Sequence, residues 1–261
     1  MHTILDLKRY PLDRPESPDF EELVATCRAQ LDENGLFNLP GFINASTVTE
    51  TVSALTPRFA AGAFTHSRRH NIYFKPQIDG LPADHPALVK LTTINQTLCA
   101  DQLADTDLSA LYHWPPFAHF LATVMGQPEL YPMVDPLAAM NAMAYHEGNA
   151  LNWHFDRSEF TTTLLLQAPD AGGAFEYAKE LRSDTDPNYD GVADLLTGRL
   201  AATRMPLTAG TLNVFKGRNT AHRVTPVKGK TARMIAVFSY FDRPGVMFSD
   251  QERLGFYGRT E

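Results

Sequence analysis

The chain lacks the features that mark several large classes of proteins. It has two cysteines, Cys27 and Cys99, whose separation is unlike that of metal-binding pairs, so we expect free thiols in a reducing, cytoplasmic environment. No apolar run approaches the roughly 20 residues that a membrane-spanning helix needs. Met1 to Tyr10 lack the apolar stretch of a secretory signal. We therefore expect neither a membrane partner nor export.

Basic runs and internal repeats are also missing. The chain has 23 Lys and Arg against 30 Asp and Glu, a net charge of −7. This balance disfavours a nucleic-acid polymer as partner, because phosphate backbones bind clusters of basic residues, but it leaves room for a nucleotide-sized substrate. With no repeat or low-complexity segment, we expect one domain over residues 1–261 with a sizeable core.

A His-x-Asp motif is present in the stretch Asn152 to Phe160. His154 and Asp156 precede a β-prone run that ends near Leu166. Residues two apart in a strand point to the same face, so the imidazole and the carboxylate can meet at one point. His222 is the candidate for a third ligand. Two His and one carboxylate on one face of a metal form the facial triad of non-haem Fe(II) oxygenases.

One arginine lies within an apolar, β-prone run. Arg233 is followed by Met-Ile-Ala-Val-Phe, and a buried guanidinium is costly unless an anion pairs with it. A dicarboxylate cosubstrate could form that pair through two parallel hydrogen bonds. His-x-Asp, a distant His and an Arg on the following strand are far more specific together than any of them alone.

The combined pattern resembles the Fe(II)/2-oxoglutarate-dependent oxygenases. More narrowly, the chain resembles the branch of free-amino-acid radical halogenases and related hydroxylases, from about Leu36 to Tyr257. The stretches that carry this resemblance are Val134 to Leu137, Trp153 to Asp156, Asp170 to Tyr177, and Gly217-Arg218 leading to His222 to Val227.

The resemblance implies an α+β fold built on a double-stranded β-helix, the jelly roll of cupin-like proteins. We expect N-terminal helices to buttress it over about residues 1–125 and the jelly-roll core to span about 130–242. The tail, 243–261, should cover one sheet or form a contact between two copies in a homodimer. The resemblance also implies Fe(II), with 2-oxoglutarate and O2 as cosubstrates.

Site residues follow from the same resemblance. His154, Asp156 and His222 should bind the metal and be catalytic, and Arg233 should bind 2-oxoglutarate. Tyr145 and Asn141, on the strand before His154, are further cosubstrate candidates, although Tyr145 could equally pack at a strand end. An amino-acid-like substrate needs partners for its carboxylate. The substrate-binding candidates near the ligands are Arg157, Arg218, Arg223 and Trp153.

Asp156 bears on the type of reaction. Halogenases of this branch have Gly at the carboxylate position, which frees a metal site for chloride. The carboxylate of Asp156 therefore favours hydroxylation of an unactivated C–H bond, with release of succinate and CO2. The alternatives are a radical halogenase of the same fold, a cupin-like metal-dependent isomerase or hydrolase, and a binding barrel without activity.

Local patterns predict the main elements. An apolar stripe predicts a helix over Asp19 to Asn34, and helical patterns also cover Thr47 to about Leu55, Asp107 to Tyr112 and Pro116 to Met125. Strands are expected at Leu36 to Leu39, Met140 to Tyr145, Phe160 to Gln167, Ala174 to Ala178 and Thr211 to Phe215. His66 to Phe74 should form a polar loop, either substrate-facing or simply solvated. Lys179 to Arg204 is an insertion, either an active-site lid or an exposed excursion.

Overall fold

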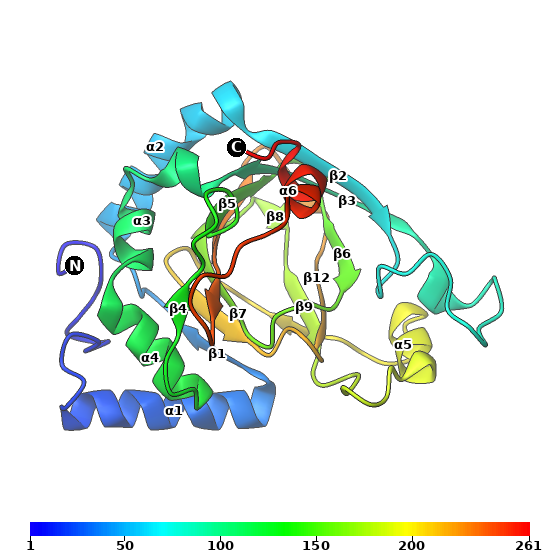
Figure 1. Cartoon of the computed structure of the whole chain (residues 1–261), viewed down its shortest axis with the longest axis horizontal. Helices are drawn as coiled ribbons and strands as arrows, with labels where there is room; N and C mark the ends of the chain where they lie inside the picture. Colours follow the sequence, from blue (N-terminus) through cyan, green and yellow to red (C-terminus); the bar gives the residue numbers. More distant parts are fainter.

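The computed structural model describes residues 1–261, and two antiparallel sheets at its centre enclose a cavity (Figure 1). The larger sheet contains, from edge to edge, β1 (Leu36–Leu39), β11 (Leu212–Phe215), β7 (Thr161–Gln167), β14 (Arg233–Phe238), β5 (Met140–Tyr145), β3 (Leu91–Leu98) and β2 (Phe64–His70). The smaller sheet contains β10 (Thr203–Met205), β9 (Phe175–Ala178), β12 (Ala221–Val224) and β6 (Leu151–His154). Two short pairs complete the set: β13 (Val227–Lys228) with β8 (Ala171–Gly172), and β15 (Tyr240–Phe241) with β4 (Tyr131–Pro132).

The larger sheet has an apolar outer face and a mixed inner face, as the two-residue period of strands requires. In β7, Leu164 and Leu166 pack into the main hydrophobic core, whereas Thr161 and Thr163 line the cavity. In β14 the residues that join the main core are Met234, Ala236 and Phe238, and those that line the cavity are Arg233, Ile235 and Val237.

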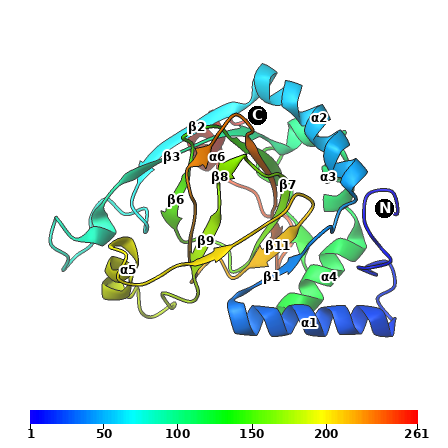
Figure 2. The ribbon, with the colours of Figure 1, turned by 180° about the vertical axis from the view of Figure 1, so that it is seen from behind.

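Helices cover the outer face of the larger sheet (Figures 1 and 2). They are α1 (Pro18–Asn34), α2 (Ala45–Gly62), α3 (Asp107–Tyr112) and α4 (Pro115–Met125). Ser17 caps α1 by accepting a hydrogen bond from the Phe20 amide, and Gly35 ends the helix in the left-handed conformation. The 3-10 turns η1 (Pro86–Leu88) and η2 (Ala100–Leu103) lie on either side of β3 in the chain. The expected helical buttress is thus present.

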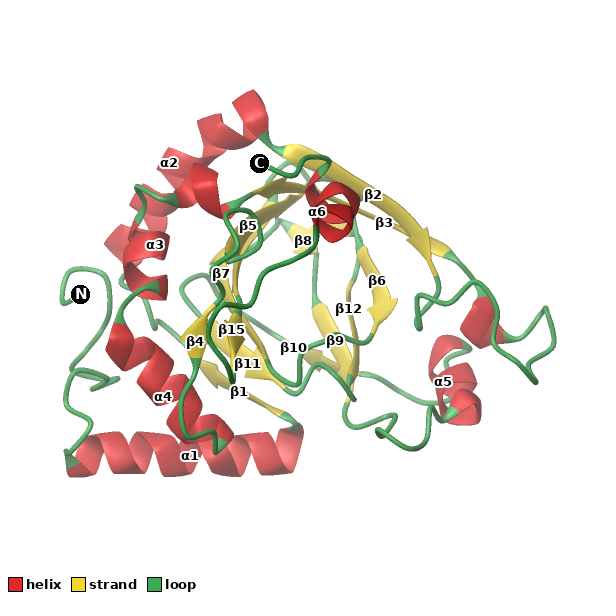
Figure 3. Cartoon of the chain, viewed as in Figure 1, coloured by secondary structure: helices red, strands yellow, loops and turns green.

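Two further helices lie apart from this layer of helices (Figure 3). The insertion contains α5 (Tyr189–Leu196), and the tail contains α6 (Asp250–Tyr257). A capping box between Ser249 and Glu252 starts α6. Its last residues, Phe256 and Tyr257, line the cavity. The tail therefore covers the cavity between the two sheets. None of the helices combines the length and the hydrophobicity needed to cross a membrane.

Three local predictions differ from the structure. The predicted loop at His66 is the edge strand β2, because its backbone pairs with β3 from Phe64 to His70 regardless of its polar side chains. Helix α2 continues through the exposed Pro57, which brings Phe59 into the core. The Gly217-Arg218 stretch predicts that His222 lies at the turn that follows it, whereas His222 lies within β12.

Candidate metal centre and its cavity

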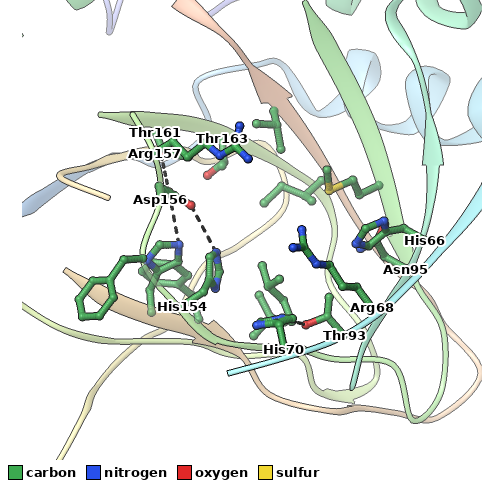
Figure 4. Close-up of a pocket in the computed structure, with 18 of the residues that line it drawn as sticks. His66, Arg68, His70, Thr93, Asn95, His154, Asp156, Arg157, Thr161 and Thr163 are labelled. Atoms are coloured by element: carbon green, nitrogen blue, oxygen red, sulfur yellow. Dashed lines mark hydrogen bonds and ion pairs between the residues drawn. The ribbon is translucent and has the colours of Figure 1, made fainter. Parts of the chain in front are cut away.

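Two histidines and one aspartate converge where the smaller sheet meets the cavity (Figure 4). His154 ends β6 and His222 lies directly opposite it on β12. The Nε2 atom of His154 lies 3.3 Å from Oδ1 of Asp156, and that of His222 lies 3.4 Å from Oδ2. The three ligand atoms all lie within 4.8 Å of one another. These distances place two nitrogens and one oxygen around a single point, as a facial triad requires.

Backbone carbonyls orient both imidazoles. Nδ1 of His154 lies 2.8 Å from the Asn152 carbonyl oxygen, and Nδ1 of His222 lies 3.0 Å from that of Thr220. A proton on each Nδ1 donates to the carbonyl, so each Nε2 presents a lone pair to the centre. Burial, and then the charge of His222, lower the pKa of His154, which keeps this ring neutral at neutral pH.

The Asp156 carboxylate is also held in place. Its backbone amide donates to the Gly217 carbonyl over 3.0 Å, and the Thr161 hydroxyl donates to Oδ2. Burial raises the pKa of this carboxyl, but the charges and hydrogen bonds of His222 and His154 together hold it well below its usual range. Two imidazole nitrogens and an ionised carboxylate form a donor set that binds Fe(II), so the residues fit the metal.

Arg233 occupies the cavity wall without a protein partner. It is 3% exposed, and its guanidinium forms no hydrogen bond or ion pair with another side chain or with the backbone. It lies directly opposite Tyr145 across β14 and β5. Burial lowers the pKa of Arg233, although not to a range in which arginine loses its proton in proteins. A buried, unpaired cation fits the distal carboxylate of 2-oxoglutarate.

The cavity has a volume of about 720 Å³ and is lined by both sheets and by α6. Asp156 is the single carboxylate in the lining. The arginines in the lining are Arg68, Arg157, Arg182, Arg218 and Arg233. The site thus combines one metal centre with a strongly cationic wall.

The structure brings most of the predicted site residues to this cavity. The metal ligands line it together with Arg233, Tyr145, Arg157 and Arg218. Arg157 pairs with Glu252 of α6 over 2.6 Å and lies over the ring of Phe256. The Arg218 side chain has no acidic partner and is exposed.

Three predicted residues lie elsewhere. The guanidinium of Arg223 lies 4.8 Å from the centre of the Trp153 ring and pairs with Glu176 over 2.7 Å, so neither side chain lines the cavity. Asn141 donates to the Leu137 carbonyl and accepts from the Tyr257 hydroxyl. Asn141 therefore positions a cavity residue and is not itself one of the residues that line the cavity.

The sequence left His66 to Phe74 open between a substrate-facing and a solvated segment and singled out no residue within it. His66, Arg68 and His70 alternate along β2 and all line the cavity, with Arg68 projecting inward in Figure 4. The His-x-Arg-x-His spacing is a strand signal that could have been recognised. No comparable sequence pattern marks Arg182, at the start of the insertion, or the residues of α6.

Comparisons with known proteins identify a family and a fold for the chain. The family described as halogenase D matches residues 21–245. No curated protein matches the chain. A 2OG-Fe(II) oxygenase family protein from Burkholderia pseudomallei is 17% identical, with a TM-score of 0.52, over 85% of this chain and 92% of that one. The carbocyclase SnoK from nogalamycin biosynthesis is 16% identical, with a TM-score of 0.56, over 93% of this chain and 95% of that one.

A prolyl-4-hydroxylase from Pseudomonas putida is 15% identical, with a TM-score of 0.51, over 83% of this chain and 98% of that one. At such identities the likeness concerns the fold. The predicted double-stranded β-helix is confirmed, because these oxygenases share the arrangement of sheets over nearly their whole length.

Proposed function

The chain belongs to the halogenase D family, and from this premise we propose that it is an Fe(II)- and 2-oxoglutarate-dependent dioxygenase that hydroxylates an unactivated C–H bond of a small molecule. We propose a free amino acid or a close derivative as the substrate. The observation that carries the proposal is the His154, Asp156 and His222 cluster, which shares one cavity with the unpaired Arg233. A cupin-like isomerase or hydrolase would use the metal ligands but would not need Arg233.

The protein's part in this reaction is to bind, orient and exclude water. Bound iron, with 2-oxoglutarate and O2, supplies the oxidising power that replaces C–H by C–OH and yields succinate and CO2. His154, His222 and Asp156 would hold the metal from one side, which leaves the other positions to the reactants. Arg233 would bind the distal carboxylate of 2-oxoglutarate through two hydrogen bonds, and the buried Tyr145 shields that pair from water.

The Asp156 carboxylate supports hydroxylation over halogenation. Halide binding needs a free position beside the metal, and Asp156 lies where its carboxylate occupies that position. The second candidate, halogenation, is favoured by the family match itself. Product analysis in the presence of chloride separates them, because the hydroxylase gives only oxygenated product and the halogenase gives a chlorinated one.

Arg157 and Arg218 are the substrate-binding residues that we retain, since both line the cavity. Their positive charge suits the carboxylate of an amino acid. Arg223 and Trp153 contact each other outside the lining, and we no longer include them.

The test of the proposal is made without oxygen. Fe(II) and then 2-oxoglutarate are added to the purified protein, and the weak visible charge-transfer band of the chelated cosubstrate is recorded. We expect a band that His154→Ala and Arg233→Met both remove, and that amino acids or their derivatives shift. If the protein holds iron but gives no band, the 2-oxoglutarate assignment is wrong and the cupin-like alternative takes its place.

A further inference from the structure

The cationic wall of the cavity carries more charge than the cosubstrate accounts for. Glu252 neutralises Arg157, and Arg233 is assigned to 2-oxoglutarate. Arg68, Arg182 and Arg218 remain, and none of them forms an ion pair. The only carboxylate in the lining, Asp156, is committed to the metal. The lining therefore offers free cations to a substrate and no free anion to a substrate ammonium group.

Arg182 is fixed in position although it has no acidic partner. Its Nε donates to the Arg218 carbonyl over 2.8 Å, and its guanidinium carbon lies 4.0 Å from the centre of the Phe155 ring. These two contacts use one N–H group and one face of the guanidinium. The terminal NH2 groups form no hydrogen bond with the protein and are left for a ligand.

The insertion that carries Arg182 is tied to the cavity wall. The Tyr73 hydroxyl donates to the Pro187 carbonyl, and the Tyr73 ring packs edge-on against Tyr189 of α5 with centroids 5.4 Å apart. Tyr73 itself lines the cavity beside Phe155. The insertion is thus a part of the cavity and not a plain excursion on the surface.

Arg182 and Arg218 belong to one part of the cavity wall, because the Arg182 side chain donates to the Arg218 carbonyl and both residues line the cavity. Burial lowers the pKa of Arg182, the charges of Tyr73 and Asp184 raise it, and the charge of Arg218 lowers it. Neither guanidinium forms an ion pair with an acidic side chain, so both keep hydrogen-bond donors for an anion in the cavity. Planar guanidinium groups bind carboxylate and phosphate oxygens in pairs, which makes this arrangement suitable for an oxyanion.

We propose that Arg182 and Arg218 form a subsite for an oxyanion of the substrate, either a carboxylate or a phosphate monoester, at the mouth of the metal cavity. This inference rests on the proposed function and narrows its substrate class to acids. It gives the insertion a role in substrate selection, because the insertion supplies one of the two arginines.

The experiment uses the full chain without oxygen, loaded with Fe(II) and 2-oxoglutarate. Inorganic phosphate, acetate and methylammonium are titrated separately at constant ionic strength, and binding is followed by calorimetry and by the thermal unfolding midpoint. Wild type is compared with Arg182→Gln, Arg218→Gln and Arg199→Gln. Arg199 is the matched control, because it follows α5, pairs with Asp194 of that helix and does not line the cavity.

We expect phosphate or acetate to bind wild type and Arg199→Gln equally, and to bind each of the other variants about tenfold more weakly, as loss of a charged hydrogen bond implies. Binding of phosphate alone indicates a phosphate ester, and binding of acetate alone indicates a carboxylic acid. Equal anion affinity in all four proteins, or binding of methylammonium in place of anions, overturns the subsite.

The same samples separate this inference from the proposed function. Anion binding that needs Arg182 and Arg218 in a protein without the charge-transfer band would support the subsite and refute the oxygenase. A charge-transfer band without anion binding would support the oxygenase and refute the subsite.

Discussion

Arg233 and Tyr145 lie directly opposite each other on β14 and β5, with the guanidinium carbon 5.8 Å from the centre of the phenol ring. No carboxylate accompanies them in this part of the wall, so the aromatic ring is the main protein group that faces the buried cation. This arrangement leaves the Arg233 charge uncompensated until an anionic ligand binds. Stability and function therefore conflict at this position.

Substitution of Arg233 by Met should stabilise the protein without its cosubstrate. The change removes an uncompensated buried charge and keeps the apolar stem, so we expect the free energy of unfolding to rise by about 1 kcal/mol. In wild type, 2-oxoglutarate at a hundredfold excess over Kd, with Fe(II), should add about 2.7 kcal/mol, and this gain should vanish in the variant. Urea unfolding with and without the ligand measures both effects. A variant that 2-oxoglutarate still stabilises would refute the role of Arg233.

Thr161 should act as a positioning residue for the metal ligand Asp156. Thr161→Val removes the hydroxyl that donates to Oδ2 and nearly keeps the side-chain volume. We expect the affinity for Fe(II) to fall by about tenfold, as is typical when the hydrogen-bond partner of a ligand is lost. Anaerobic titration with Fe(II) measures this change. Thr161→Ser, which keeps the hydroxyl, should restore the affinity, and equal affinities in all three proteins would contradict the role.

The metal ligands could be predicted because their chemistry is local. His154 and Asp156 need only a strand to reach one point, and His222 needs a neighbouring strand that runs beside it. The pairing of β12 with β6, which brings His222 opposite His154, depends on the fold as a whole. That pairing became predictable only through the resemblance to a family.

Two substrate candidates lie outside the cavity lining for a reason that the sequence already contained. Trp153 and Arg223 are each next to a metal ligand in a strand, and adjacent residues point to opposite faces. Their side chains therefore meet on the far side of the smaller sheet. Their proximity to the metal ligands in the sequence suggested that they share the site, but the alternation of side chains along a strand directs them away from it.

Arg182 could not be found from the sequence. The insertion around it is polar and without periodicity, so nothing indicated which of its residues would face inward. Its position depends on Phe155, on the Arg218 backbone and on the contacts of Tyr73 with the insertion. Contacts between segments so distant in the chain are set by tertiary packing alone.

Asp135 should stabilise the tail that covers the cavity. Its buried carboxylate pairs with Arg253 over 2.9 Å and accepts from the Phe248 amide, just before α6. Replacement by Asn removes the buried one of the two acidic partners of Arg253 and leaves only the exposed Asp250 at 3.4 Å, and we expect a loss of about 3 kcal/mol at neutral pH. Urea unfolding measures the loss. Asp105→Asn, which removes the partner of Arg58 at the surface, should leave the unfolding midpoint nearly unchanged.

The effect of Asp135 should depend on pH. Burial raises the pKa of this carboxyl, but amide hydrogen bonds from Ala138, Leu137 and Phe248, with Arg253, lower it below its ordinary value. A lowered pKa in the folded state gives stability that is present above the unfolded value of about 3.9 and is lost as the pH falls through the folded value. The difference in unfolding free energy between wild type and Asp135→Asn should therefore shrink below about pH 4. A difference that stays constant with pH would contradict this account.

Gly217 should be required for the metal centre because no side chain fits there. A Cβ atom at this position would clash with Oδ2 of Asp156 and lie 2.8 Å from Oγ1 of Thr161, the two groups that hold the carboxylate in place. Gly217→Ala should therefore displace Asp156 and weaken Fe(II) binding by tenfold or more, as loss of ligand orientation implies. Gly255→Ala, in α6, is the matched control, since nothing lies within 4 Å of its Cβ position. We expect that control to bind Fe(II) like wild type and to unfold at a slightly higher temperature, because alanine favours a helix over glycine. Undiminished Fe(II) affinity in Gly217→Ala, in a protein that remains folded, would mean that Asp156 is not held against Gly217 as the structure shows.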